Sequence, residues 1–480
     1  MKQLENRRKL QFRKLAAILS ILVLGLLIRG LTANFIAAHF ADPGWFQSGS
    51  FAIFDKQAQQ VLDGKESFFW IPDSSRTDLI QYPPGNRVWI ASIYAATGER
   101  SAASVQRVQL VVDSFSILLV IGIGVSAYGW GVGLTAGVLA ALSPLLALYA
   151  TVPGADAPTS WLVLAAVWLL LLSFKRRSLA YGIGAGVLLG LSCWLRVNPL
   201  LLFVAWTIAL LLFLRVAWRQ RLRLAAAISA TTLLVIAPVV IRNLIVFYPQ
   251  VAPTGLGVGS NFLAGIGETD RGTEFVAPCC DAEMIEQDRR EMGLPPDAPL
   301  GLHFPDGISR DRERGRRAFA IIKVHPLWYA GVIAKRALGH LKLAGRPVRS
   351  LGSTGINVTS RKCLPAHLQV VPLSTGVNAL GMIQSVLRYC AVPFGLIGIC
   401  LALRQDFRLA AILLSTVIYY LATLSVAHSE IRYGLPMQAL FLVFCALGAC
   451  SLWKAARSLR EKRENTTQIS LDNDDGGQRH

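Results

Sequence analysis

Residues 15–38 read LAAILSILVLGLLIRGLTANFIAA, an apolar run that directly follows Arg13 and Lys14. A helix of about 20 apolar residues is long enough to cross the hydrocarbon core of a bilayer. Long apolar runs recur at residues 108–128, 131–150, 158–174, 179–195, 198–217, 224–243, 386–403, 408–426 and 434–453. The sequence therefore predicts an all-α polytopic membrane protein with about ten transmembrane helices. No convincing small-residue cleavage site follows the first run, so we expect an uncleaved span rather than a signal peptide.

The composition agrees with insertion into a bilayer. The chain has 480 residues, of which 53% are hydrophobic and 16% are charged, and its mean hydropathy is +0.46. Its formal net charge of +19 would suggest a nucleic-acid partner in a soluble chain. Here the Lys and Arg residues gather beside the ends of the apolar runs, as the positive-inside rule describes for cytoplasmic segments. We therefore expect the lipid bilayer, and no nucleic acid, as a partner.

The basic segments alternate along the chain and predict its orientation. They are the N-terminus 1–14, Lys175 to Arg177, residues 215–223, Arg404 with Arg408, and the tail from Lys454. We therefore expect these segments on the cytoplasmic side of a bacterial inner (plasma) membrane, with both termini in the cytoplasm. The same orientation places four segments on the outer face, namely residues 39–107, 151–158, 244–385 and 428–433.

The predicted regions differ in size. Residues 15–243 form a transmembrane module whose first outer loop, 39–107, carries interfacial helices. Residues 244–385 form a small extramembrane region between the seventh and eighth spans, in which 281–317 are expected to be solvated helix and 325–343 an amphipathic interfacial helix. Residues 386–453 close the bundle with three helices. The cytoplasmic tail, 454–480, is rich in Asn, Asp, Gln and Gly from residue 464 and is expected to be disordered there.

Ionisable residues lie within or beside the apolar runs on the predicted outer side: Arg29, Arg107, Asp113, Asp156, Arg196, Arg242, Arg388 and Arg432. A charge at membrane depth is costly, so it usually pairs or faces an aqueous site. Some of these side chains are expected to reach the interface or to pair, as Arg29 with Asp113. As a group, the arginines also suit a phosphate or pyrophosphate head group, because guanidinium is planar and permanently charged. Both interpretations stay open from the residues alone.

Several short patterns follow one another on the predicted outer face. They are Phe54-x3-Ala58-x3-Leu62-x-Gly64, Tyr82-Pro83-Pro84-Gly85, Arg107 at the second span, Leu195-Arg196-x2-Pro199, Pro238-x3-Arg242-Asn243 and Glu430-x-Arg432-Tyr433-x2-Pro436. With these patterns in this order, the chain resembles the GT-C superfamily of integral-membrane glycosyltransferases, in particular the bacterial protein-mannosyltransferase and aminoarabinose-transferase type. The resemblance covers about residues 15–260 and 386–450, whereas residues 260–385 match no pattern of that type.

The resemblance implies transfer of a sugar from a polyprenyl-phosphate-linked donor to an acceptor at the outer face, with inversion. It leaves open whether the sugar is a hexose or a pentose, and whether the acceptor is a protein, a lipid or a glycan. The implied contacts of the carrier phosphate are Arg196, Arg242 and Arg432, supported by Arg107. Further candidate substrate-binding residues in the same patterns are Tyr82, Glu430 and Tyr433. Tyr82 also suits a structural role in its Pro-Pro-Gly turn.

The resemblance also implies an aspartate of the first outer loop as general base, which accepts the proton of the attacking group. In the family's spacing this aspartate lies four residues before the aromatic residue at position 54, and that position is Ser50. We therefore consider Asp42 first, then Asp55 and Asp156, as the catalytic carboxylate. Asp42 also suits a helix-ending Pro-Gly turn, and Asp156 suits a helix N-cap before Pro158. A divalent metal ion is left open as a cofactor.

The eight cysteines form no metal-binding pattern. Five lie in apolar runs and are expected to be inert thiols. Cys279, Cys280 and Cys363 lie in the outer segment, where an oxidising environment favours a disulfide between Cys363 and one of the adjacent pair.

Two other classes of function compete with sugar transfer. One is a transporter or flippase of lipid-linked sugar intermediates, in which the arginines bind phosphate and no bond is broken. The other is a carrier-binding subunit without transfer activity, which is favoured by Ser50 at the position where the family has an aspartate.

Overall fold

The structure is a computed structural model that describes residues 2–38, 40–41, 50–214, 216–342, 375–428 and 430–476. Within these ranges the chain forms helices and turns and no β-strand. The long or apolar helices are α1 (Lys2–Ala37), α4 (Ala102–Tyr128), α5 (Trp130–Leu142), α6 (Pro144–Thr151), α7 (Asp156–Arg176), α8 (Leu179–Leu195), α9 (Leu202–Phe213), α10 (Trp218–Phe247), α15 (Thr375–Val426) and α16 (Leu435–Gly476). The remaining helices are α2 (Ser50–Leu62), η1 (Thr77–Ile80), α3 (Gly85–Thr97), α11 (Val258–Gly267), α12 (Asp281–Glu291), α13 (Gly307–Val324), α14 (Pro326–Leu341) and η4 (Ile431–Gly434).

The protein is a multi-pass membrane protein, as the apolar runs predict. Six helices in the described part of the chain are long and apolar enough to cross a bilayer, or up to seven when the bent pair α5–α6 is one span. Helices α8 and α9 are apolar but shorter, and α15 holds two of the expected runs with non-helical backbone at Asp406. Each expected run therefore has a helical counterpart, whereas the count of about ten spans stays a prediction.

The expected single span 131–150 is instead broken. Helices α5 and α6 meet at an angle of 59°. Ser143 ends α5 and its hydroxyl accepts a hydrogen bond from the N–H of Leu146, while Pro144 occupies the first position of α6. Proline has no N–H to donate and is favoured at a helix start, so it ends one helix and begins the next. The apolar composition on both sides of Pro144 hides this break in the sequence.

The buried pair of Arg29 and Asp113 joins α1 to α4. Arg29 Nε donates to Asp113 Oδ2 at 2.7 Å, and both side chains are almost completely buried. Trp161 of α7 donates its indole N–H to the other carboxylate oxygen at 2.5 Å. This confirms the expectation that these two residues pair. The hydrogen bonds to both oxygens satisfy a charge that would be costly at membrane depth.

Close helix contacts at small residues hold the bundle together. Gly398 of α15 lies directly against the backbone of Phe444 in α16, so that a Cβ atom at residue 398 would overlap the carbonyl oxygen. Gly186 of α8 meets the backbone of Ile228 in α10 in the same way. Such contacts are typical of membrane helices, whose association depends on close packing rather than on exclusion of water.

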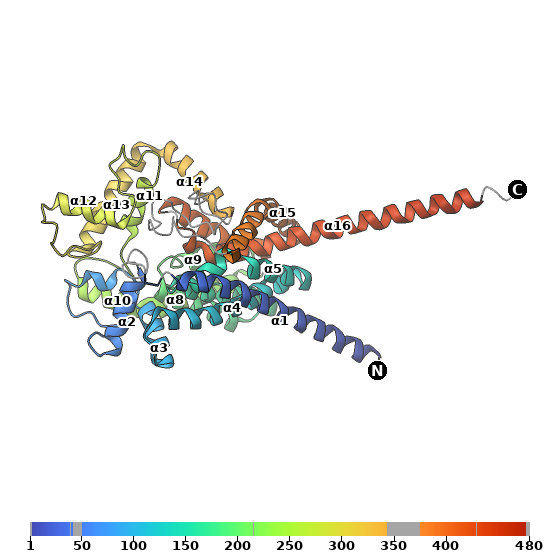
Figure 1. Cartoon of the computed structure of the whole chain (residues 1–480), viewed down its shortest axis with the longest axis horizontal. Helices are drawn as coiled ribbons and strands as arrows, with labels where there is room; N and C mark the ends of the chain where they lie inside the picture. The colour runs from blue at the N-terminus through green and yellow to red at the C-terminus, as the bar shows by residue number, and fades with distance from the viewer. Residues whose placement is uncertain are drawn as a thin grey trace.

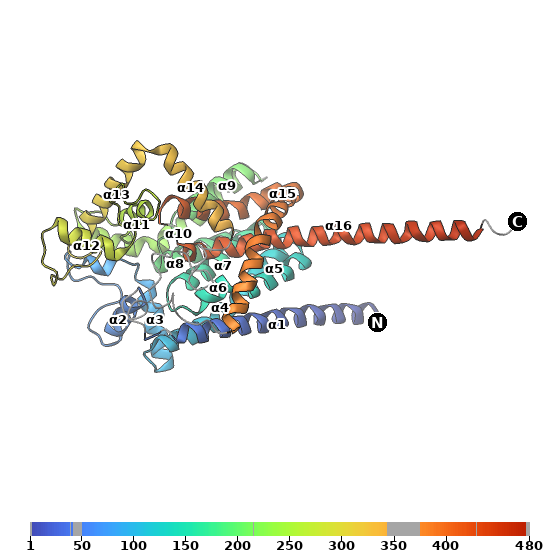
Figure 2. The same cartoon turned by 45° about the horizontal axis from the view of Figure 1, so that its top comes forward.

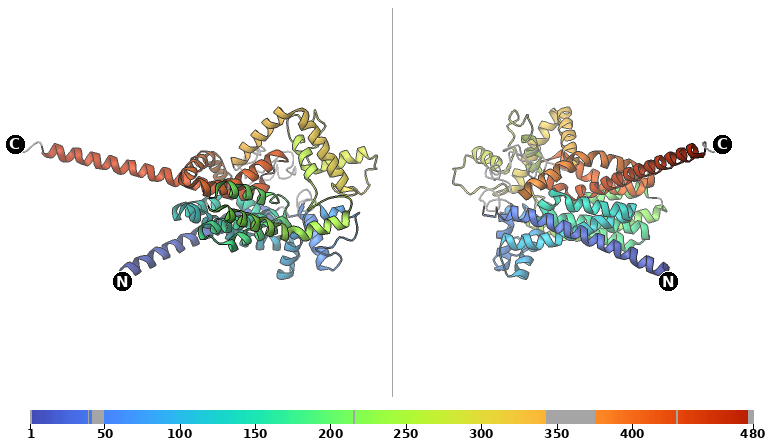
Figure 3. Two further views of the ribbon diagram at one scale, coloured as in Figure 1. Left: turned by 180° about the vertical axis from the view of Figure 1, so that it is seen from behind. Right: turned by 45° about the vertical axis from the view of Figure 1, so that its right-hand side comes forward.

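Figures 1 and 3 show α1 and α16 extending from one end of the helical bundle, so both chain ends lie on the same side. Helices α2 and α11–α13 lie at the opposite end, as the turned view in Figure 2 also shows. This arrangement agrees with the predicted alternation of basic connections and outer segments. Which of the two sides faces the cytoplasm stays a prediction.

The tail differs from the expected disorder, because α16 continues to Gly476. The sequence from Lys454 to Lys462 is rich in Lys, Arg, Ala and Glu, which are strong helix formers. Arg457 and Glu461 add an i,i+4 ion pair at 2.8 Å. The charged residues that predict a cytoplasmic location for this segment therefore also favour its helical conformation.

Helices α11–α14 form a lobe, which we call the outer lobe after its predicted location. The expected helix 281–317 is two helices, α12 and α13, separated by a segment that contains Pro295 and Pro296. Asp288 of α12 forms ion pairs with Arg310 and Arg314 of α13, which ties the two helices together. Helix α14 begins at Pro326, close to the expected amphipathic helix 325–343, and packs against α15.

Candidate functional site

Two arginines at the end of the bundle opposite to the chain termini share one aromatic ring. Arg196 follows the end of α8 and Arg432 lies in η4, just before α16. Their guanidinium groups lie 4.2 Å and 5.3 Å from the ring centroid of Tyr433. Stacking on an aromatic face holds guanidinium in place without consuming its hydrogen-bond donors. The ring therefore positions two cationic groups side by side.

Carboxylates balance these arginines only in part. Asp156, in the first turn of α7, lies 2.8 Å from Nη1 of Arg196, and Glu430 lies 3.4 Å from Nε of Arg432. The Nε atom of Arg196 is buried without a hydrogen bond, and Nε of Arg432 has no hydrogen bond of good geometry. Both guanidinium groups therefore keep donors for a further anion.

His428 extends the cluster toward the outer lobe. Its Nδ1 lies 2.8 Å from Glu268, and its Nε2 lies 3.3 Å from Glu430. Burial alone would lower the pKa of His428, but the two carboxylates outweigh it and raise the pKa well above the usual 6.5. The two carboxylates therefore favour the cationic form of His428, which links α11 to the turn before η4. We call Asp156, Arg196, Glu268, His428, Glu430, Arg432 and Tyr433 the outer charged cluster.

Tyr82 and Ser50 lie beside this cluster. The hydroxyl of Ser50, the first residue of α2, is 3.2 Å from that of Tyr82, whose ring packs edge-on against Phe54. Burial raises the pKa of Tyr82, and the charge of Arg196 acts on it in the opposite direction. The resemblance implies an aspartate at position 50, where this chain has the hydroxyl group of Ser50. Ser50 contacts Tyr82, and Tyr82 is within electrostatic range of Arg196 and Tyr433.

The structure brings together six of the predicted site residues: Tyr82, Asp156, Arg196, Glu430, Arg432 and Tyr433. The alternative role of Asp156 as a helix N-cap is wrong, because α7 begins at Asp156 itself and Ala155 is the N-cap. An acidic residue in the first turn of a helix still interacts favourably with the helix dipole.

Other predicted residues make their contacts elsewhere. Arg107 is 64% exposed and pairs with Glu99. Arg242 donates to the side chain of Asn243 and to the carbonyl of Phe69. Neither arginine contacts the outer charged cluster within the described residues. The sequence patterns contain both residues, but pattern membership does not say which helix end each side chain faces.

The three carboxylates considered as the general base do not lie together. Asp156 belongs to the outer charged cluster. Asp55 accepts hydrogen bonds from the Tyr94 hydroxyl and the Gln59 amide, so both of its oxygens are engaged. Asp42 lies outside the described residues, and its role stays a prediction.

Asp281 is a carboxylate that the sequence did not single out. It is the first residue of α12, and the charges that act on it are those of His428, Arg432, Arg314 and Glu430. Its side chain is exposed, and it forms no hydrogen bond or ion pair with another described residue. The only local signal is an aspartate at a predicted helix start, which is too common to indicate function.

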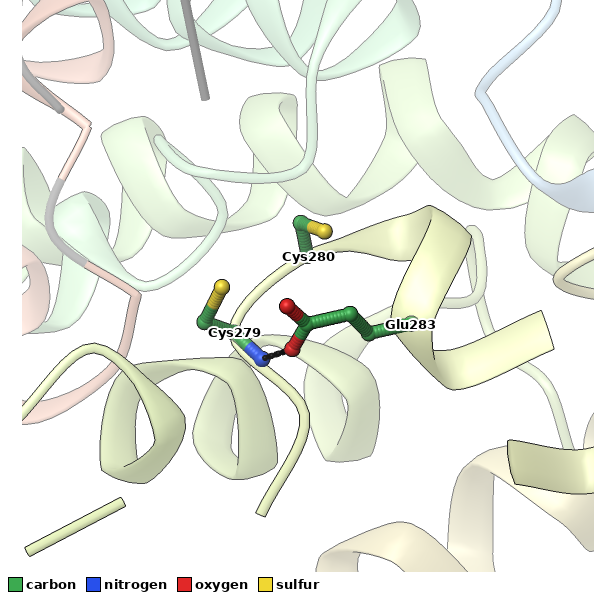
Figure 4. A group of neighbouring side chains, drawn as sticks. All are labelled: Cys279, Cys280 and Glu283. Carbon is green, nitrogen blue, oxygen red and sulfur yellow. Dashed lines mark hydrogen bonds between the residues drawn. The ribbon is translucent and has the colours of Figure 1, made fainter. Parts of the chain in front are cut away.

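Cys279, Cys280 and Glu283 stand at the same helix start, and their ligand atoms lie within 4.8 Å of one another (Figure 4). One oxygen of Glu283 accepts a hydrogen bond from the N–H of Cys279 at 2.8 Å. A structural zinc site takes four ligands, whereas this group offers three, of which one is already engaged. We interpret it as a helix-start contact and not as a metal site. Cys363 lies outside the described residues, so its disulfide stays a prediction.

Comparison with known proteins bears on this arrangement in two ways. Residues 83–241 match the family model described as dolichyl-phosphate-mannose-protein mannosyltransferase. This segment includes Tyr82's neighbours Pro83 to Gly85 as well as Asp156 and Arg196. A search of curated protein sequences found no significant match.

Solved structures with a similar fold include the oligosaccharyltransferase AglB from Archaeoglobus fulgidus. Its complex with an inhibitory peptide and a dolichol-phosphate aligns with a TM-score of 0.50 at 13% identity, over 93% of this chain and 52% of AglB. The apo form aligns with a TM-score of 0.50 at 14% identity, over 94% and 52%. ArnT from Cupriavidus metallidurans, bound to undecaprenyl phosphate, aligns with a TM-score of 0.34 at 13% identity, over 82% and 71%.

The helical bundle with its outer lobe is thus a polytopic membrane protein with the GT-C fold. Within that class, residues 83–241 carry the sequence pattern of the protein-mannosyltransferase type. The chain spans about half the length of the AglB structures that it matches, 52% of each.

Proposed function

We propose that the protein is a glycosyltransferase that moves a sugar from a polyprenyl-phosphate-linked donor to an acceptor at the outer face of a bacterial inner membrane. The observation that carries the proposal is the pair of guanidinium groups on Tyr433, which keep free donors beside carboxylates at the outer end of a GT-C fold. In this orientation both termini are cytoplasmic, as the basic connections predict.

The arginines would act on the leaving group. When the bond between the sugar and its phosphate breaks, negative charge develops on the phosphate oxygen. Arg196 and Arg432 can stabilise this charge through charge-assisted hydrogen bonds, since their Nε atoms lack good partners. Stabilisation of a charge that appears only as the bond breaks lowers the barrier, rather than merely tightening the binding of the donor.

The carrier is expected to approach through the bilayer. AglB has been solved with a dolichol-phosphate and with a peptide, which supports a lipid-linked donor for the shared fold. The outer charged cluster lies at the outer ends of α7, α8 and α16, where the phosphate of a membrane-anchored polyprenyl chain would be found. The sugar and the acceptor are not specified by these contacts.

Deletion of the gene tests this proposal in cells. We expect a polyprenyl-phosphate sugar to accumulate and one surface lipid, glycan or protein to lose that sugar, as seen by mass spectrometry of lipid and envelope extracts. Restoring the wild-type gene should reverse both changes, and restoring Arg432→Ala should reverse neither. Unchanged lipids and surface glycans in the deletion strain would contradict the proposal.

Ser50 favours a second candidate, a subunit that binds the carrier without transferring the sugar. Its hydroxyl occupies the position of the family's aspartate beside Tyr82. The two functions differ in turnover. Purified protein in detergent, where no compartments exist, should release undecaprenyl phosphate from a synthetic donor if it is an enzyme, and should only bind the donor if it is a subunit or a flippase.

A further inference from the structure

An inverting transfer needs a carboxylate that can take the proton of the acceptor, and within the described residues the carboxylates predicted from the sequence are engaged in other contacts. Asp55 is held by Tyr94 and Gln59, and Asp156 is ion-paired to Arg196 at 2.8 Å. Both oxygens of Asp55 accept hydrogen bonds, and the carboxylate of Asp156 balances a guanidinium group. The base is therefore expected to come from another segment.

Helix α11 brings such a segment to the outer charged cluster. Gly265 lies against Ala427, so that a Cβ atom at residue 265 would be 2.9 Å from the carbonyl carbon of Ala427. Gly267, two residues later, lies directly against the carbonyl of Pro278. Only glycine permits these two backbone approaches. As a result, the end of α11 places residue 278 and the segment that follows it next to the turn that holds His428.

Asp281 begins α12 three residues after Pro278. Four charged groups face it: His428, Glu430 and Arg432 from the turn before α16, and Arg314 from α13. Tyr82, which binds the hydroxyl of Ser50, is also within range of its charge. Asp281 is therefore within electrostatic range of the side chain that contacts Ser50.

The state of Asp281 suits a proton acceptor. Its side chain is exposed, in contrast to the engaged carboxylates of Asp55 and Asp156. Although solvent reaches this side chain, the protein atoms around it displace part of its hydration. This desolvation is the largest influence on its pKa and raises it, while His428, Arg432 and Arg314 oppose the rise. A base works best when its pKa lies near the operating pH, so a raised pKa improves a carboxylate for this task.

We propose that Asp281, at the start of α12, is the general base for sugar transfer and takes the place of the aspartate that Ser50 replaces. The inference rests on the proposed function. Residues 260–385 match no pattern of the family, so this part of the chain would supply the catalytic carboxylate from a segment that the family resemblance does not cover.

The oxygen or nitrogen of the acceptor forms a bond to the anomeric carbon of the sugar, and the bond from that carbon to the phosphate oxygen breaks. The bonding electron pair leaves with the phosphate, which gains a negative charge next to Arg432 and Arg196. The proton of the acceptor passes to a carboxylate oxygen of Asp281 and is later released to water.

The test compares purified full-length variants in detergent with undecaprenyl-phosphate mannose as the donor and an envelope extract as the acceptor. Release of undecaprenyl phosphate and affinity for undecaprenyl phosphate are measured separately. For Asp281→Asn we expect the rate to fall by at least about 100-fold and the affinity to change by less than about 2-fold. Asp281→Glu keeps a carboxylate and should retain more activity, with a shifted acid limb in its pH profile.

Two comparisons separate catalysis from structural damage. Asp297→Asn, an exposed change in the same outer lobe, should keep the wild-type rate. Asp281→Ala should regain part of its activity when formate is added, because a small carboxylate can occupy the vacated space. A purely structural role would give no rescue.

Opposite results would overturn the assignment while leaving the proposed function intact. If Asp281→Asn keeps its rate and Asp42→Asn loses it, then Asp42 is the base. If Asp281→Asn loses rate and carrier affinity together, without rescue by formate, then Asp281 serves the structure of the site. Failure of the proposed function itself looks different, because the wild-type protein would then release no undecaprenyl phosphate from any of a panel of donors.

Discussion

At the scale of single residues, the site depends on how Tyr433 holds two arginines. Its ring contacts both guanidinium groups, and among the described residues each arginine forms an ion pair with one carboxylate, Asp156 for Arg196 and Glu430 for Arg432. Two cations that share a ring repel each other unless an anion lies between them. Arg432 keeps 32% of its side chain exposed, so an incoming phosphate can reach it without displacing α16.

Replacing Arg432 by alanine should weaken binding of undecaprenyl phosphate by about 10- to 100-fold, since a hydrogen bond to a charged group contributes about 1.5–3 kcal/mol. Arg432→Lys should recover only part of the loss, because ammonium lacks the planar fork of guanidinium. Binding can be followed by tryptophan fluorescence in detergent. Arg290→Ala, which removes an exposed arginine from α12, is the control and should bind as wild type does. Equal losses in both variants would indicate a general charge effect.

His428 should make the stability of the outer side sensitive to alkaline pH. Its pKa in the folded protein is raised well above 6.5 by Glu268 and Glu430, with Arg432 and Arg336 in contact with the same carboxylates. A raised pKa adds stability that is fully present below pH 6.5 and is lost as the pH rises through the folded value. The melting temperature of the wild type should therefore exceed that of His428→Gln at pH 6.5, and the difference should shrink as the pH is raised. A difference that grows with pH would contradict this assignment.

At the scale of secondary structure, hydrophobic length predicted the helices well, because a run of about 20 apolar residues is a local property of the sequence. The break at Pro144 was not predicted, because the local composition there allows either a bend or a straight helix. The break between the runs 386–403 and 408–426 was predicted, and it agrees with the non-helical backbone at Asp406 inside α15. The pairing of Arg29 with Asp113 was predicted, since both charges lie at the same depth in neighbouring spans.

Breaking that pair should destabilise the bundle. Arg29→Ala leaves Asp113 buried beside Trp161 without its cation, and loss of one partner of a buried ion pair costs about 3–5 kcal/mol. The double change Arg29→Leu with Asp113→Leu removes both charges and should cost less than Arg29→Ala alone. Thermal unfolding in detergent measures both variants. A double variant that is less stable than the single one would show that the pair contributes more than mutual neutralisation.

The candidate site was predicted only in part, and the reason is distance along the chain. Arg196, Glu430, Arg432 and Tyr433 could be named, because each belongs to a short pattern next to an apolar run. Asp281 could not, because its position depends on how Gly265 and Gly267 pack against segments far away in the sequence. Arg107 was grouped with the other arginines by its position at a span, but its side chain turns toward Glu99.

At the scale of the whole molecule, the bundle separates a side with both chain ends from a side with the outer lobe (Figure 1). Every member of the outer charged cluster lies in a turn or at a helix end on the lobe side. A site placed there meets the bilayer interface, where a lipid-linked phosphate is accessible to a polar acceptor. Which of these two sides faces the cytoplasm therefore decides which compartment supplies the acceptor.

Reporter fusions test that orientation. A fluorescent protein fused after residue 462 should fluoresce, because the basic end of α16 is expected in the cytoplasm. A protease site inserted at residue 297, in the segment between α12 and α13, should be cut in spheroplasts without lysis. Cleavage only after lysis, with no fluorescence from the C-terminal fusion, would reverse the topology and place the site on the cytoplasmic side.

Turnover of the donor by the purified protein tests the central claim most directly. Wild-type protein in detergent, given a panel of undecaprenyl-phosphate sugars and an envelope extract, should release undecaprenyl phosphate in more than one equivalent per protein. Arg432→Ala should release it far more slowly. Binding of the same donors without release by the wild-type protein would contradict sugar transfer and identify the protein as a carrier-binding subunit or a flippase.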